Sequence, residues 1–163
     1  MSREYSEIEL EIIKKAEKKA LRLLDISPRT EKNLREKLEE NEFPDYAVEE
    51  AVAYVKSFHY VDDARYAELF ILSRKKEKSR FEIRHSLSDR GVDSETIEKS
   101  MEEQEWDESD TVRSVFLKKY RFKDLSDQKN YEKAFRYFAG RGFLYEDIKK
   151  GIASAIREMN DPD

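Results

Sequence analysis

The chain of 163 residues contains three copies of one sequence unit, and this internal repeat limits the possible folds more than any other feature. The register is marked by Leu38, Leu87 and Phe138, which are 49 and 51 residues apart. In every copy, apolar residues lie four residues before this anchor and five, ten and fourteen residues after it: Leu34, Ile83 and Ala134; Phe43, Val92 and Phe143; Val48, Ile97 and Ile148; Val52, Met101 and Ile152.

The spacing within a copy predicts two helices joined by a tight turn. Eight residues before each anchor stand Thr30, Ser79 and Asn130, all of which are residue types that cap a helix N-terminus. The turns read "ENEFPD", "DRGVDS" and "GRGFLY", and we expect Asn41, Gly91 and either Gly140 or Gly142 to adopt the left-handed conformation that ends a helix. A further helix then begins near Asp45 or Ser94.

A third helix precedes each of these pairs, so the sequence predicts nine helices in three groups of three. In the first copy, apolar residues step by four from Ile8 to Leu24. Four glycines and three prolines are too few for the turns of a β-rich fold. A unit of about 50 residues buries little surface alone, so neighbours should stack. The predicted fold is all-α, with three tandem three-helix repeats at 1–58, 59–106 and 107–163 forming an elongated, curved array.

Composition excludes several classes of function. The chain has no cysteine, which removes disulfides, thiolate metal sites and cysteine nucleophiles. Its first residues are charged and it has no long apolar run, so we expect a cytoplasmic protein without a membrane segment. It carries no phosphate-cradling glycine loop, HExxH or nucleophile elbow. We therefore expect a binding protein with no enzymatic activity, cofactor or metal.

The stretch "FHYVDDARYAELFI", residues 58–71, contains the adjacent carboxylates Asp62 and Asp63. Neighbouring residues at a helix start point in different directions and form a poor metal site, whereas acidic residues there cap and stabilise a helix. We interpret both as structural, with Phe58, Tyr60 and Val61 anchoring the entry into the helix. His59 has no second ligand at a suitable spacing.

Two stretches are candidates for contacts with phosphates or with an acidic protein. Residues 74–80 hold five basic residues and one acid, and 111–123 hold five basic residues and no acid. Either stretch can instead be a solvated helix end, and the aromatics of the second, Phe116, Tyr120 and Phe122, are spaced for burial as well as for stacking on bases. The candidate residues are Arg74, Lys75, Lys76, Lys78, Arg80 and Arg84, followed by Lys118, Lys119, Arg121 and Lys123.

Three features of this sequence resemble the RecX family, the bacterial regulators of the recombinase RecA. They are the pattern from Leu23 through Pro28-Arg29-Thr30 to Leu38, the turn His59-Tyr60-Val61-Asp62-Asp63, and the pattern from Ile83 to Val92. The likeness covers about residues 16–103, and His59 stands where the family has a glycine.

The resemblance implies a modular helical-repeat protein that binds RecA nucleoprotein filaments and limits filament growth, ATP hydrolysis and strand exchange. The basic residues of the two stretches would then contact filament protein or its DNA, and we expect the chain to act as a monomer. Two other classes stay open: a helical-repeat adaptor with no recombinase target, and a protein that binds single- or double-stranded DNA directly.

Overall fold

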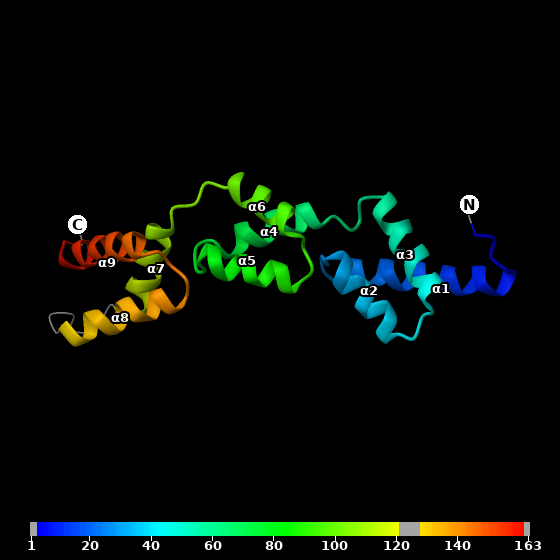
Figure 1. Ribbon diagram of the computed structural model, residues 1–163, viewed down its shortest axis with the longest axis horizontal. Coiled ribbons are helices and arrows are strands. Elements are labelled where there is room, and N and C mark those ends of the chain that lie inside the picture. Colours follow the sequence, from blue (N-terminus) through cyan, green and yellow to red (C-terminus); the bar gives the residue numbers. More distant parts are fainter. Residues whose placement is uncertain (1–2, 121–127, 162–163) are drawn as a thin grey trace. The chain divides into compact units, whose positions relative to one another are not determined.

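The computed structural model describes residues 3–120 and 128–161, and every regular element in these residues is an α-helix (Figure 1). The all-α, three-helix-repeat prediction is therefore confirmed. No helix in this part of the chain is long and apolar enough to cross a bilayer. The helices are α1 (Glu7–Ile26), α2 (Glu31–Glu40), α3 (Asp45–Ser57), α4 (Asp63–Arg74), α5 (Arg80–Asp89), α6 (Ser94–Glu102), α7 (Glu108–Tyr120), α8 (Gln128–Gly140) and α9 (Tyr145–Asn160).

Side chains at two of the three predicted capping positions start the middle helix of their copy. Thr30 accepts a hydrogen bond from the Asn33 N–H at 3.2 Å at the start of α2, and Ser79 does the same for Glu82 at 3.1 Å at the start of α5. The third copy differs, because α8 begins at Gln128 and Asn130 lies inside it.

The helices expected near Asp45 and Ser94 begin at these residues, and the residue before each one occupies the capping position. The carboxylate of Asp93 caps α6 by accepting from the Thr96 N–H at 2.8 Å, so Ser94 is the first helical residue and not the cap. Pro44 precedes α3 and has no side chain able to cap it. A proline suits this place because its fixed φ leads directly into a helix.

The left-handed residue of each turn stands one position before the apolar plug. Gly91 (φ 86°) and Gly142 (φ 85°) adopt this conformation as predicted, but in the first turn it is Glu42 (φ 64°) and not Asn41. Gly140 is the last residue of α8 and has no positive φ. The turn therefore has one geometry in all three copies, although only two of them use glycine.

The chain divides into two compact units, residues 1–67 with 88–97, and residues 68–87 with 98–163. In the first unit, α1 packs on α3 through small side chains, since Ala16, Ala20, Ala47 and Ala51 are fully buried. In the second, α7 packs on α9 (Figure 1). Gly151 allows this close approach, because a Cβ there would lie 2.6 Å from the Ser109 carbonyl oxygen.

Within the first unit, the start of α2 meets the turn that follows α5, in a contact that we call the first junction. The Thr30 hydroxyl donates to the Arg90 carbonyl at 2.7 Å. The carboxylate of Asp63, the first residue of α4, accepts from the Glu31 N–H at 3.0 Å. A Cβ at Gly91 would lie 2.5 Å from the Cβ of Lys32. A glycine is needed both for its φ and for this approach.

Within the second unit, the start of α5 meets the turn that follows α8 in the same way, forming the second junction. The Ser79 hydroxyl donates to the Arg141 carbonyl at 2.6 Å. Glu108, the first residue of α7, accepts from the Arg80 N–H at 2.6 Å. A Cβ at Gly142 would lie 2.6 Å from the Cβ of Phe81. One arrangement of hydroxyl, carboxylate and glycine thus joins successive groups of helices at both places.

Candidate functional site

The first basic stretch forms the end of α4 and the link to α5. Arg74 is the last residue of α4, and the backbone turns back on itself because the N–H groups of Lys75 and Lys78 donate to the carbonyls of Ile71 and Arg74, at 2.8 and 2.9 Å. Arg74, Lys76 and Lys78 are exposed on this turn. Within the described residues, Lys76 has no hydrogen bond or ion pair.

Arg80 is held in the second junction and has little freedom to reach a partner. Its guanidinium donates to the Trp106 carbonyl at 2.8 Å, lies 3.5 Å from the buried Glu108 carboxylate and stacks 4.9 Å over the Trp106 ring. The same contact gives Trp106 a structural role, because its ring packs against the Arg80 guanidinium.

Two more predicted residues have contacts within the second unit. Arg84 pairs with Glu98 through Nε and through Nη2, the latter at 3.3 Å. The Lys75 ammonium donates to the Glu105 carbonyl at 2.9 Å, and its own carbonyl accepts from the Thr111 hydroxyl at 2.8 Å. Exposed ion pairs of this kind open at small cost, so Arg84 keeps the ability to meet an anion.

The second basic stretch lies next to the first. Lys118 on α7 is 3.7 Å from the carboxylate of Glu77, the one acid of the first stretch. Lys119 lies 3.4 Å from the centre of the Tyr137 ring. The predicted residues Arg121 and Lys123 are outside the described residues. Five exposed cations of the two stretches form what we call the basic surface: Arg74, Lys76, Lys78, Lys118 and Lys119.

The sequence interpretation of the turn at residues 58–63 needs two corrections. Asp62 caps α4 by accepting from the Arg65 N–H at 3.1 Å, as expected, but Asp63 caps α2 across the first junction. Burial raises the pKa of the Asp63 carboxyl, against the hydrogen bond from the Glu31 N–H, which lowers it. Among the described residues there is no group of three His, Cys, Asp or Glu side chains that could hold a metal.

The second correction concerns the aromatic residues of this turn, which are at the surface. Val61 is buried, but Phe58 and Tyr60 are 52% and 57% exposed, with their rings stacked 5.5 Å apart. His59 between them has a φ of 58°, in the left-handed region.

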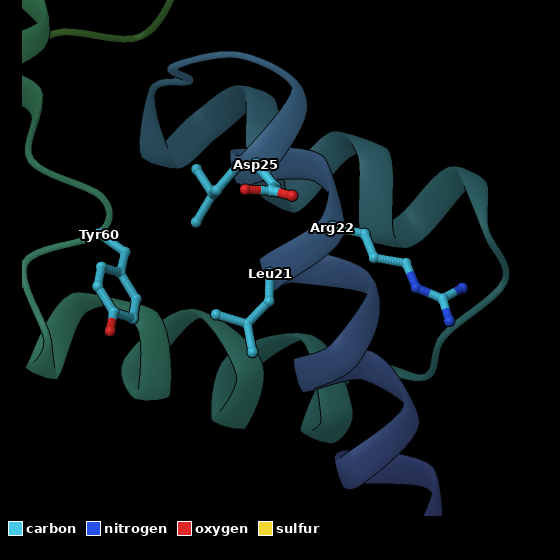
Figure 2. Close-up of a pocket in the computed structure, with 5 residues that line it drawn as sticks. Leu21, Arg22, Asp25 and Tyr60 are labelled. Atoms are coloured by element: carbon cyan, nitrogen blue, oxygen red, sulfur yellow. The ribbon is translucent and has the colours of Figure 1, made fainter.

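Tyr60 borders an open hollow of about 440 Å³ against α1. Figure 2 shows the Tyr60 ring facing Leu21 across this space, with Asp25 above and the guanidinium of Arg22 directed away. The lining holds one acid, Asp25, and one base, Arg22. Exposed, ordered aromatics of this kind are common at protein interfaces.

Sequence reasoning missed the carboxylates that cross the junctions, Asp63 and Glu108, and it missed Arg141. The Arg141 guanidinium lies 2.9 Å from the Glu82 carboxylate and is only 16% exposed. The sequence contains a signal for Arg141, because an arginine directly precedes the left-handed glycine in both the second and the third copy, as Arg90 and Arg141. The partners of Asp63 and Glu108 are about 30 residues away and have no such signal.

Comparison with known proteins identifies two domains in tandem. Residues 16–54 match the first three-helix domain of RecX, and residues 62–101 match the second. The chain is 27% identical to the regulatory protein RecX of Clostridium acetobutylicum over 89% of this chain and 71% of that protein. It is 32% identical to the regulatory protein RecX of Pectobacterium atrosepticum over 90% of this chain and 86% of that protein.

A crystal structure of RecX from Lactobacillus salivarius has the same fold, with a TM-score of 0.72 at 19% identity over 90% of this chain and 97% of that one. Against the clostridial RecX proteins of C. acetobutylicum, C. perfringens and C. tetani, the chain spans 71%, 64% and 62% of the relative's length. The paired domain matches, together with the relative from Pectobacterium, show that the chain belongs to the RecX family of regulatory proteins.

Proposed function

We propose that this chain regulates the recombinase RecA by binding RecA filaments on DNA and inhibiting filament growth, ATP hydrolysis and strand exchange. The observation that carries the proposal is the tandem match to the two RecX three-helix domains, because the RecX family is the family of RecA regulators that the sequence resembles. This role places the protein in the cytoplasm, and one copy suffices for it.

The basic surface supports the proposal as the part that contacts the filament. Lys76 has no pairing partner among the described residues, and Lys118 is paired only with exposed Glu77 at 3.7 Å. Releasing these cations to a phosphate or a carboxylate therefore breaks no buried contact. Arg80 belongs to the junction instead, so we assign it to stability and not to binding.

The experiment measures ATP hydrolysis by RecA on single-stranded DNA while this protein is added. The wild-type chain is expected to inhibit hydrolysis at sub-stoichiometric amounts. Reversing two exposed charges with Arg74→Glu and Lys76→Glu should raise the amount needed several-fold. The matched control reverses two exposed charges on α1, Lys14→Glu and Lys18→Glu, and should inhibit like wild type.

Each outcome has a distinct meaning. Equal inhibition by both double variants would reject the basic surface while keeping the proposed function. No inhibition by the wild-type chain would reject the proposed function. In that case a salt-sensitive shift of DNA alone supports the direct DNA binder, and no effect in either assay supports the adaptor.

A further inference from the structure

The third group of helices departs from the first two at one set of surface positions. The repeat register equates Phe135 with Arg35 and Arg84, and equates Lys149 with Glu49 and Glu98. In the first two groups these positions form an ion pair, Arg35 with Glu49 and Arg84 with Glu98. In the third group the pair is replaced by an aromatic ring and a lysine.

Two more aromatic residues appear at neighbouring positions that are polar in both other copies. Tyr131 stands where the first two copies have Glu31 and Arg80, and Tyr145 stands where they have Asp45 and Ser94. The same helical scaffold is therefore stable with polar side chains at all three places. Tyr131 and Phe135 pack in part against the core of the second unit, whereas Tyr145 is 59% exposed, so core packing does not explain Tyr145.

These rings line an open hollow of about 400 Å³ between α8 and α9. The Phe135 and Tyr145 ring centres are 5.1 Å apart, and Tyr145 is 59% exposed. Two cations, Arg136 and Lys149, also line the hollow. Neither side chain makes a hydrogen bond or an ion pair within the described part of the chain. Gln128 and one acid, Glu132, complete the lining, and the Glu132 carboxylate accepts a hydrogen bond from the Gln128 side chain at 3.4 Å.

Two positions of the lining have also changed the sign of their charge, while Glu132 keeps one acid there in place of Lys32 of the first copy. The first copy has acids at both changed positions, Glu36 and Glu49, where the third has Arg136 and Lys149. Aromatic faces beside unpaired cations are the combination by which proteins hold single-stranded nucleic acid, since bases stack on the rings and phosphates meet the cations. A flat apolar protein surface would satisfy the rings but leave both cations without a counter-charge.

We infer that the hollow between α8 and α9 binds single-stranded DNA, with a base stacked on Tyr145 and the flanking phosphates at Arg136 and Lys149. The inference rests on the proposed function in that it gives the regulator its own contact with the DNA strand of a filament. It is distinct from the basic surface, which lies at the α4–α5 link and on α7.

The test measures binding of the full chain to a 5′-fluorescein-labelled 20-nucleotide oligothymidylate by anisotropy, without RecA. The key variant, Phe135→Arg with Lys149→Glu, rebuilds the ion pair of the other two copies, so the fold has a precedent for it. We expect it to weaken binding about tenfold or more, because it removes the ring beside Tyr145 that shapes the stacking face and reverses the charge at one phosphate contact. Wild-type affinity in this variant would overturn the inference.

A second variant protects the test against misfolding. Tyr145→Ser restores the residue of the second copy at an exposed position and should weaken binding while far-UV circular dichroism stays unchanged. Unchanged binding by a folded Tyr145→Ser protein would likewise overturn the inference.

The salt dependence separates the phosphate contacts from the stacking. Neutralising both cations of the lining with Arg136→Gln and Lys149→Gln should lower the slope of log K against log salt by about 1.4, since each contact to a single strand contributes about 0.7. The control, Lys14→Gln with Lys18→Gln on α1, removes the same charge and should keep the wild-type slope. Equal slopes in the two double variants would contradict the assignment.

Two further arms distinguish other ligands. Competition by thymidine monophosphate as effective as that by the oligomer would indicate a free-nucleotide site and reject the strand. Loss of RecA inhibition in the rebuilt variant with DNA affinity intact would indicate a protein contact and also reject it. Wild-type DNA binding without any RecA inhibition would reject the proposed function and leave this site standing.

Discussion

Replacing Gly142 by alanine tests the second junction most directly, and Gly140, two residues earlier, supplies the control. Gly142 has a φ of 85°, and a Cβ there would lie 2.6 Å from the Cβ of Phe81. Gly140 has no positive φ, and nothing lies within 4 Å of the place where its Cβ would be. Gly142→Ala and Gly140→Ala add the same methyl group, the first at a crowded site with a left-handed backbone and the second at an open site without one.

The expected changes in the free energy of unfolding have opposite signs. At Gly142 the left-handed backbone costs an alanine about 1–2 kcal/mol, and crowding against Phe81 costs about 1–3 kcal/mol more. Gly142→Ala should therefore destabilise the second unit by about 2–5 kcal/mol. Gly140→Ala should stabilise it by about 0.4–1 kcal/mol, because alanine restricts the unfolded chain.

Urea unfolding followed by tryptophan fluorescence measures this effect where it occurs. Trp106 is the one tryptophan of the chain and contacts Arg80 in the same junction. Midpoints that differ while the slopes agree would report a change in stability alone. A Gly142→Ala protein within about 1 kcal/mol of wild type would refute both the strain and the contact with Phe81.

Three further substitutions test other contacts. Glu108→Ala removes the partner of the Arg80 N–H from a side chain only 6% exposed, and should cost about 1–3 kcal/mol by urea unfolding. Glu108→Gln keeps an acceptor and should cost less, and equal losses would argue against this hydrogen bond. Asp63→Asn tests the raised pKa of that carboxyl: with a folded pKa above its ordinary 3.8, the wild type loses stability as pH rises through that pKa, and the variant does not. The melting temperature of Asp63→Asn should thus gain on wild type between pH 3 and pH 7, whereas a constant difference would contradict the shift. Arg84→Ala breaks a pair whose side chains are 44% and 49% exposed, and should cost under about 1 kcal/mol, with the loss shrinking in high salt. A larger, salt-independent loss would mean that Arg84 stabilises the protein mainly through packing of its side chain and not through the ion pair with Glu98.

The repeat allowed most of the fold to be predicted, because burial acts on the same positions in each copy. Leu38, Leu87 and Phe138 are all fully buried, as their shared register indicates. The failures fall where the copies differ locally. Asn130 lies inside α8, which starts at Gln128, and the left-handed residue of the first turn is Glu42 although asparagine adopts that conformation more readily.

The candidate site was harder to predict, because a list of basic residues does not reveal their partners. Arg80 and Lys76 belong to the same stretch, yet Arg80 is bound to Trp106 and Glu108, more than 20 residues away. Phe58 and Tyr60 are residue types expected in a core, yet they are 52% and 57% exposed on either side of His59, which has a positive φ. Contacts that join distant parts of the chain leave no periodic signal, so they emerged only from the structure.

Glu42 restricts the first group of helices to the first place in the series. Gly91 and Gly142 admit the start of a preceding middle helix because they have no side chain, but a glutamate at the same place would drive its Cβ into that helix. A copy of the first group inserted between the second and third would therefore fail to dock until Glu42 became glycine. The first module therefore cannot take the place of either of the other two, and a designer who lengthens such a chain must copy a turn that contains glycine.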